Sequence, residues 1–396
     1  MASVANVAAI AELECELAQR SAAGLTRVRR IVDSPQGPRL SIGGRTLLSF
    51  ASNDYLGLAN APDIADAACE SIRRHGVGAG ASHLIVGHTR LHETIEDELA
   101  AYVAPCDGAR ALMFSSGYLA NLAILTALAS RNDAIFADRL NHACLTDGAL
   151  LSRARIARYR HCDVVALTRA LETSTERRRF IITDAVFSMD GDIAPLPELL
   201  QLADQFDAWL VVDDAHGFGV LGGGRGTLAH FGLRSERIVY MGTLGKAAGV
   251  AGAFVAAHAA VIETLVQTAR PYIYTTASPP ALAAAIGAAL KSIRADDFRR
   301  AHLADVIAQF REGAQRLPWT LPPSSTPIQP LIIGDVTAAV AISDALLARG
   351  ILVPAIRPPT VPVGTARLRV SLSASHTRED VDLLIAALHD VAASFA

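Results

Sequence analysis

A chain of 396 residues, 51% hydrophobic and 19% charged, has the composition of an ordinary globular protein and a length suited to two or three domains. Its net charge of −3 gives no polybasic character, so nucleic acid is not an expected partner. No apolar stretch reaches the roughly 18 residues of a membrane helix, and no basic segment precedes the Ala-rich start, so we expect neither membrane association nor a signal peptide. The five scattered cysteines form no CxxC pair, which favours a reducing cytoplasm.

The first predicted element is a helix over residues 5–25, followed by the turn-rich residues 33–38; we assign residues 1–45 to an N-terminal arm. From about residue 108, short apolar runs alternate with longer Ala- and Leu-rich segments. This alternation predicts an α/β domain, which we place at residues 46–284, with a mostly parallel sheet covered by helices on both faces. The runs are residues 111–114, 134–137, 180–183, 209–212 and 238–241.

The texture of the sequence changes after Ser278. An Ala-rich helix begins near Pro280, and a charged helical stretch follows over residues 294–316. A strand-like segment, residues 366–372, then precedes a final amphipathic helix. These elements predict a smaller C-terminal α+β domain over residues 285–396.

Two polar residues follow predicted strands directly, at the sheet edge where α/β proteins bind ligands. Lys246 lies among small residues just after the run 238–241, and Asp213 ends the run 209–212. A confined lysine can form a Schiff base with pyridoxal 5′-phosphate (PLP), and a buried carboxylate can face its pyridine nitrogen. The combination favours a PLP enzyme, with the neighbouring Asp214 pointing elsewhere and fixing the turn.

The segment 115–121 joins a predicted strand to a helix. Gly117 leaves the first helical N–H groups free to bind a phosphate, and Thr243 could add a hydroxyl. An ordinary turn with a serine N-cap is the alternative. His216 could donate to the phenolic oxygen of PLP and His142 could lie on the pyridine face; a lone histidine is otherwise a surface or core residue.

Two other patterns carry weaker signals. His83, His88 and His92 could approach one another, but HTRLH is not the HExxH pattern of zinc proteases, and we predict no metal site. The glycine-rich residues 76–81 do not fit GxGxxG and follow a helix-like segment, which argues against dinucleotide binding.

A series of motifs, in the same order, resembles those of the α-oxoamine synthases. The resemblance runs from about residue 28 to the C-terminus and implies a PLP-dependent transferase of fold type I, like aspartate aminotransferase. These enzymes condense an amino acid with an acyl thioester and release carbon dioxide. The motifs are residues 52–57 (SNDYLG), 116–118 (SGY), 138–142 (DRLNH), 186–191 (VFSMDG), 213–216 (DDAH) and 243–246 (TLGK).

The resemblance implies roles around the cofactor ring. Lys246 would bind the cofactor covalently and move the Cα proton of the amino acid. Asp213 would contact the pyridine nitrogen and His142 would stack on the ring. Ser188 and His216 would hydrogen-bond around the phenolic oxygen.

Other roles implied by the resemblance concern the phosphate and the substrate. Arg357 would bind the amino-acid carboxylate, while Thr360 and Arg29 would lie on the substrate side, with Arg30 left as an alternative to Arg29. The family forms its sites at a homodimer interface, and Thr275 or Thr276 would reach the partner subunit's phosphate. The residues that would hold the phosphate of the same subunit are Gly117, Tyr118 and Thr243.

Within this family, residues 356–369 most closely resemble the members of biotin biosynthesis that join L-alanine to a pimeloyl thioester. The thioester could be carried by coenzyme A or by acyl carrier protein, and the sequence reveals no basic patch that would decide. A glycine C-acetyltransferase and, more distantly, a PLP aminotransferase are the alternatives. The chain departs from its relatives at Phe218 and at residues 83–86, which leaves the acyl-chain preference open.

Overall fold

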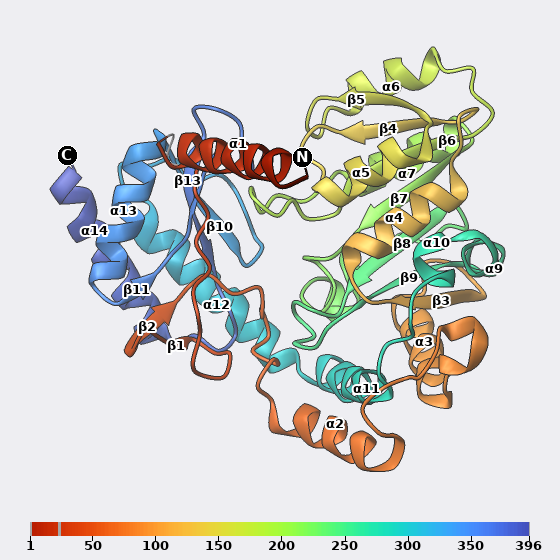
Figure 1. The fold of residues 1–396 in the computed structure, drawn as a ribbon, viewed down its shortest axis with the longest axis horizontal. Helices are drawn as coiled ribbons and strands as arrows, with labels where there is room; N and C mark the ends of the chain where they lie inside the picture. Colours follow the sequence, from red (N-terminus) through yellow and green to blue (C-terminus); the bar gives the residue numbers. More distant parts are fainter. Residues whose placement is uncertain (1, 23–24, 396) are drawn as a thin grey trace.

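The computed structural model describes residues 2–22 and 25–395 and shows a larger and a smaller domain side by side (Figure 1). The larger domain is formed around a seven-stranded sheet. In spatial order the strands are β3 (Ala109–Phe114), β9 (Ala253–His258), β8 (Ile238–Thr243), β7 (Ala208–Asp213), β6 (Arg179–Asp184), β4 (Ala134–Asp138) and β5 (Arg155–Tyr159).

The sheet is mixed and mostly parallel, which confirms the predicted fold class. Strands β8, β7, β6, β4 and β5 pair in parallel, whereas β9 is antiparallel to both β8 and β3. Each of the five apolar runs lies within a strand. Strands β5 and β9 were not predicted, because the edge strand β5 carries two arginines, Arg155 and Arg158, in only five residues and β9 is rich in alanine.

Both faces of the sheet are covered, as expected for buried strands. Successive strand residues alternate between two hydrophobic clusters: Ile238 and Tyr240 of β8 face one, Val239 and Met241 the other. The second cluster includes α4 (Gly117–Leu128), α5 (Ala143–Ser152), α9 (Ala259–Thr268) and α10 (Arg270–Ile273). The first includes α3 (Arg90–Val103), α6 (Val164–Glu172), α7 (Leu196–Gln205), α8 (Thr227–Phe231) and α11 (Pro280–Ala295).

The smaller domain combines both ends of the chain. One sheet has the order β1 (Arg39–Ile42), β2 (Arg45–Ser49), β11 (Ile351–Leu352), and the other has the order β10 (Ile328–Gly334), β13 (Ala366–Ser371), β12 (Ala355–Ile356). The helices of this domain are α12 (Asp297–Ala314), α13 (Val336–Ala348) and α14 (Arg378–Phe395). The remaining elements are α1 (Ala2–Ala22), α2 (Pro62–His75), η1 (His83–Gly87) and η2 (Gly222–Gly224).

The pairing of strands bears on the domain limits expected from sequence. Strand β2 pairs in parallel with β11, so residues 45–49 belong with the C-terminal sheet and not with the large domain. The expected limit near residue 285 falls inside α11, a single helix that packs against α2 and α3. No helix within the described residues is both long enough and apolar enough to cross a membrane.

Candidate functional site

Lys246 lies in a tight loop between β8 and β9, at the carboxyl end of the sheet. The loop is closed by hydrogen bonds from Leu244 N to the Gly252 carbonyl oxygen (2.9 Å) and from Gly249 N to the Lys246 carbonyl oxygen (2.9 Å). Gly249 has a φ of +69°, and a Cβ there would lie 2.4 Å from the carbonyl carbon of Leu58. The loop therefore packs directly on the backbone that follows the 52–57 motif, which holds the lysine in one place.

The Lys246 amine faces a buried histidine. Its Nζ lies 2.9 Å from His216 Nε2, and His216 Nδ1 lies 2.6 Å from the Tyr55 hydroxyl. Burial lowers the pKa of His216 well below its usual value, and the positive charges of Lys246 and Arg369 add to this effect. Burial also lowers the pKa of Lys246, although the Asp213 carboxylate opposes that shift. The site thus contains a neutral imidazole beside a lysine that loses its proton more easily than usual.

Asp213, the last residue of β7, is buried with its carboxylate held on both sides. Oδ2 accepts a hydrogen bond from Asn121 Nδ2 (2.7 Å) and Oδ1 accepts one from Ala215 N (3.0 Å). The thiol of Cys144 lies 3.9 Å from Oδ2. These donors fix the carboxylate in a single orientation at the strand end.

Asp214 points away from this carboxylate, as expected from sequence. Its Oδ2 accepts from Thr227 N (2.6 Å) and from the Tyr240 hydroxyl (2.9 Å), and its Oδ1 accepts from Thr227 Oγ1 (2.6 Å). Burial raises the pKa of Asp214 to about 7. Its contacts join the turn after β7 to the start of α8.

His142 forms the N-cap of α5. Its Nδ1 lies 2.8 Å from Cys144 Sγ, and its backbone N–H donates to Asp184 Oδ2 at 2.6 Å. Asp184 is fully buried; burial raises its pKa well above the usual value, and the negative charge of Asp213 raises it further. Cys144 thus contacts both His142 and Asp213, a link that could not be predicted from sequence, where the scattered cysteines carry no pattern.

The residues expected to hold a phosphate lie around the start of α4. Gly117 is the first helical residue, and Ser116 Oγ accepts a hydrogen bond from Leu119 N (3.3 Å), so the serine N-cap is present. The exposed Tyr118 donates its hydroxyl to Asp147, and Thr243 Oγ1 donates to the Gly252 carbonyl oxygen (3.2 Å).

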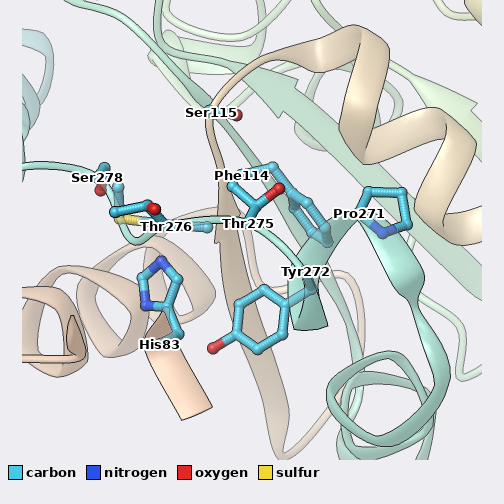
Figure 2. Close-up of a pocket in the computed structure, with 9 residues that line it drawn as sticks. His83, Phe114, Ser115, Pro271, Tyr272, Thr275, Thr276 and Ser278 are labelled. Carbon is cyan, nitrogen blue, oxygen red and sulfur yellow. The ribbon is translucent and has the colours of Figure 1, made fainter. Parts of the chain in front are cut away.

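A small cavity of about 10 Å³ lies beside this helix start (Figure 2). Ser115, Thr275, Thr276 and His83 line it, and Figure 2 shows the two threonines between Ser115 and the His83 ring. A backbone bridge between Ser82 and Thr276 holds the threonine segment against the loop that carries His83. The threonines expected to reach the partner subunit therefore lie close to the start of α4.

The three histidines weighed above as metal ligands contact one another. His83 Nδ1 lies 2.9 Å from His88 Nδ1, and His88 Nε2 lies 2.9 Å from Glu93 Oε2. His92 lies 2.9 Å from the Ser278 carbonyl oxygen through Nε2. The histidine side chains thus form hydrogen bonds among themselves and with neighbouring oxygens.

The substrate-side arginines of the N-terminal segment and the 356–369 segment lie in a different place. Arg357 donates to the Thr26 carbonyl oxygen (2.8 Å). Arg357, Thr360 and Arg30 line a cleft of about 440 Å³ between the N-terminal segment and the smaller domain. Arg29 is exposed and is not among the residues that line this cleft.

Arg369 was given no role in the site from the sequence, but the structure places it there. It is buried on β13, donates from Nε to the Ser188 carbonyl oxygen (2.6 Å), and donates from Nη1 and Nη2 to Asn53 Oδ1 (3.2 and 3.3 Å). Asn53 Oδ1 also accepts from the Tyr55 hydroxyl at 3.2 Å. Arg369 is therefore connected to His216 and Lys246. The available signal was an arginine inside a strand-like apolar segment, since a buried arginine needs partners.

The comparisons with known proteins agree with this geometry. The family model for class I and II aminotransferases matches residues 45–388. A curated 8-amino-7-oxononanoate synthase from Nitrosospira multiformis is 56% identical over 376 residues, which cover 95% of this chain and 94% of that protein. A serine palmitoyltransferase variant from S. paucimobilis, with a bound PLP–myriocin aldimine, has a TM-score of 0.90 at 28% identity over 97% of both chains.

A solved structure with the first of these names is also similar. The 8-amino-7-oxononanoate synthase from Francisella tularensis has a TM-score of 0.76 and 32% identity, covering 88% of this chain and 99% of that one. The chain therefore belongs to the 8-amino-7-oxononanoate synthases, within the PLP-dependent fold type I enzymes of aminotransferase class I and II.

Proposed function

We propose that this chain binds PLP through Lys246 and condenses L-alanine with a pimeloyl thioester, yielding 8-amino-7-oxononanoate, carbon dioxide and the free thiol for biotin biosynthesis. The main support for this proposal is the position of the Lys246 amine. Its Nζ lies 2.9 Å from Nε2 of the buried His216, at the same sheet edge as the oriented Asp213 carboxylate. The names of the close relatives support the choice of substrates.

The residues present fit PLP. Lys246 is a largely desolvated primary amine with a lowered pKa, the form that reacts with an aldehyde. Asp213 is a buried carboxylate suited to a pyridinium nitrogen. At Gly117 a Cβ would approach Met241 Cε to 3.4 Å, so glycine leaves room at a helix start suited to a phosphate. When bound, PLP supplies an electron sink for negative charge at the Cα of the amino acid.

The chain's own groups then have distinct tasks. Lys246 takes and returns the Cα proton, since its lowered pKa makes the neutral, basic amine more available than in an exposed lysine. Asp213 would stabilise positive charge on the ring nitrogen, and His142, at the exposed start of α5, would contact the ring face. Ser188 and His216 would hydrogen-bond near the phenolic oxygen, and Gly117, Tyr118 and Thr243 would hold the phosphate.

For the amino-acid carboxylate we favour Arg369 over Arg357. The Arg369 guanidinium is connected to Lys246 through Asn53, Tyr55 and His216, whereas Arg357 bonds to the N-terminal segment. An arginine can bind a carboxylate with two parallel hydrogen bonds. Arg357 then belongs to the acyl-donor side of the site.

The 440 Å³ cleft supports a place for that donor. Arg20, Arg27, Arg30 and Arg357 all line it, so the arginines that look scattered in the sequence gather on one surface. Such a surface suits the phosphates of coenzyme A or the acidic surface of a carrier protein. Thr360 lines the same cleft, and Arg29 stays an alternative contact. We infer a homodimer in the cytoplasm, with Thr275 or Thr276 reaching the partner's phosphate.

Product analysis tests the proposal directly. The purified protein, supplied with PLP, is incubated with L-alanine or glycine and with pimeloyl or acetyl thioesters, and the released thiol and carbon dioxide are measured. The proposal requires L-alanine with the pimeloyl thioester to be the preferred pair. Preference for glycine with the acetyl thioester would assign a glycine C-acetyltransferase, and amino exchange with 2-oxoglutarate without thiol release would assign an aminotransferase.

A further inference from the structure

A continuous chain of side-chain hydrogen bonds leads from the small domain to the reactive lysine. Arg369 donates to Asn53 Oδ1 with both terminal nitrogens, at 3.2 and 3.3 Å, and the Tyr55 hydroxyl lies 3.2 Å from the same oxygen. Tyr55 is also 2.6 Å from His216 Nδ1, and His216 Nε2 is 2.9 Å from Lys246 Nζ. Neither Tyr55 nor Asn53 received a role from the sequence.

The direction of each hydrogen bond follows from the groups at its ends. Arginine can only donate, so the Asn53 group that faces Arg369 must be the amide oxygen. The Tyr55 hydroxyl donates its single proton to that oxygen at 3.2 Å. The Tyr55 oxygen is then an acceptor for His216 Nδ1–H. Because the buried His216 is neutral, its Nε2 carries no proton and presents a lone pair to Lys246.

We propose that Tyr55 is a positioning residue that sets the tautomer of His216, and that Asn53 and Arg369 hold Tyr55 in the required orientation. In the cofactor-free protein, His216 Nε2 then accepts a hydrogen bond from the Lys246 ammonium group and stabilises the charged amine, so the donation from His216 to the phenolic oxygen expected from the sequence requires the other tautomer. This inference rests on the proposed role of Lys246, but it concerns how the chain itself controls that amine. Burial lowers the pKa of Lys246, and the hydrogen bond to His216 opposes that shift. The bond therefore helps to set the pH above which the lysine is neutral and reactive.

Burial makes the Tyr55–His216 hydrogen bond difficult to replace. Tyr55 is completely buried, and burial raises the pKa of its hydroxyl, so it stays protonated. His216 is also buried, and water is therefore a poor substitute for the lost partner of Nδ1. Without Tyr55, the tautomer of His216 with its proton on Nε2 is favoured, because the neutral Lys246 amine can accept a hydrogen bond from that N–H. That tautomer favours the uncharged amine.

The test measures the basicity of Lys246 in the full-length, cofactor-free protein. The chain has only two lysines, Lys246 and the exposed Lys291, so the pH dependence of reductive methylation can be followed at each by peptide mapping. Tyr55→Phe should lower the pKa of Lys246, and each tenfold gain in the neutral-amine fraction should speed its modification near neutral pH by about tenfold. Lys291 is the internal reference and should be unchanged.

Two further variants make the result specific. Asn53→Ala removes the acceptor of the Tyr55 proton, so the hydroxyl should turn toward His216 Nδ1 and speed Lys246 modification as well. Tyr240→Phe loses an equally buried hydroxyl, whose partner is Asp214, and should leave Lys246 unchanged. Circular dichroism identifies any variant that does not fold, and Asn53→Ala then carries the test if Tyr55→Phe fails.

A double-mutant cycle separates positioning from general disturbance. In a His216→Asn background, Tyr55→Phe should have no further effect on Lys246, because the proposed influence passes through the imidazole. An unchanged Lys246 profile in folded Tyr55→Phe and Asn53→Ala, or an effect that persists without His216, would overturn the inference. The measurement needs neither PLP nor turnover, so its failure is distinct from failure of the proposed reaction.

Discussion

The guanidinium of Arg369 and the side-chain oxygen of Asn53 face each other across the boundary between the strands of the small domain and the segment that leads into the large one. Both terminal nitrogens of the arginine donate to this oxygen. An incoming carboxylate would find two donors already aligned, which suits two-pronged binding. The relationship leads to separate expectations for Arg369 and Arg357.

Arg369→Lys should lower kcat/KM for L-alanine by roughly tenfold or more, since hydrogen bonds to charged groups contribute about 1.5–3 kcal/mol. Arg357→Lys should leave the L-alanine dependence close to that of the parent protein and act on the acyl donor instead. Steady-state kinetics with each substrate varied in turn measure both effects. The reverse pattern would return the carboxylate to Arg357.

Lys246→Ala should abolish turnover and the visible absorbance of lysine-bound PLP, because the chain's other lysine, Lys291, is exposed on α11. Lys291→Ala is the matched control and should keep both properties. Borohydride reduction followed by peptide mapping should fix the label at Lys246 alone in the parent protein. Full activity in Lys246→Ala would refute the proposed chemistry.

His142→Ala should still bind PLP but react slowly, because the residue's expected contact is with the ring face and not with the covalent bond. Its loss also removes the side-chain cap of α5, which costs about 1 kcal/mol of stability. His142→Asn restores a capping side chain without an imidazole and so separates the two effects. Absorbance titration with PLP and single-turnover rates measure them; a parental rate in His142→Asn would leave the histidine a capping role only.

Gly249→Ala should impair PLP loading and destabilise the protein. The left-handed φ costs a non-glycine residue roughly 1–2 kcal/mol, and the added Cβ meets the backbone at Leu58 and Ala59. Gly287→Ala is the control, because a Cβ there meets nothing within 4 Å and the position is helical. It should stabilise α11 by about 0.5–1 kcal/mol. Thermal unfolding and the visible spectrum report both outcomes.

Glu96 gives a pH-dependent contribution to stability that is separate from the site. Burial raises its pKa from 4.5 to about 8, while a hydrogen bond from Met113 N opposes the shift. Because the folded protein binds this proton more tightly, the stabilisation is complete below about pH 4.5 and is lost as the pH rises toward 8. At pH 8 the urea midpoint of Glu96→Gln should therefore be higher than that of the parent protein, whereas at pH 5 it should not.

The exposed Glu172→Gln is the control for that comparison and should show no such difference between the two pH values. Denaturation followed by circular dichroism at each pH supplies the midpoints. Parallel pH profiles for Glu96→Gln and the parent protein would show that this carboxyl does not titrate differently on folding.

Sequence patterns predicted most of the large domain because each parallel strand except β5 contains a run of mainly apolar residues. Strand β9 escaped prediction because alanine favours helices; its conformation is imposed by pairing with β3 and β8 on both sides. The expected helix over residues 5–25 is present as α1. Its expected extent includes residues 23 and 24, which lie outside the described residues.

The candidate site was predicted where residues follow strand ends and missed where the contacts come from distant segments. Lys246 and Asp213 follow adjacent strands, so their proximity can be deduced from the order of the sheet. Arg369 and Asn53 are joined only by the packing of the small domain, for which no local pattern exists. Tyr55 belongs to a recognised motif, but its contact with His216 depends on how that loop folds over the sheet.

The parallel pairing of β2 with β11 has a consequence for how the protein is made. Leu48 of β2 pairs with Arg39 inside the early hairpin, but its partner on the other edge of the strand is Ile351, so that edge stays unpaired on the ribosome until most of the polypeptide has been synthesised. The seven-stranded sheet uses residues 109–258 and can assemble during that interval. Nascent chains halted near residue 300 should therefore contain a protease-resistant core and an unprotected leading segment.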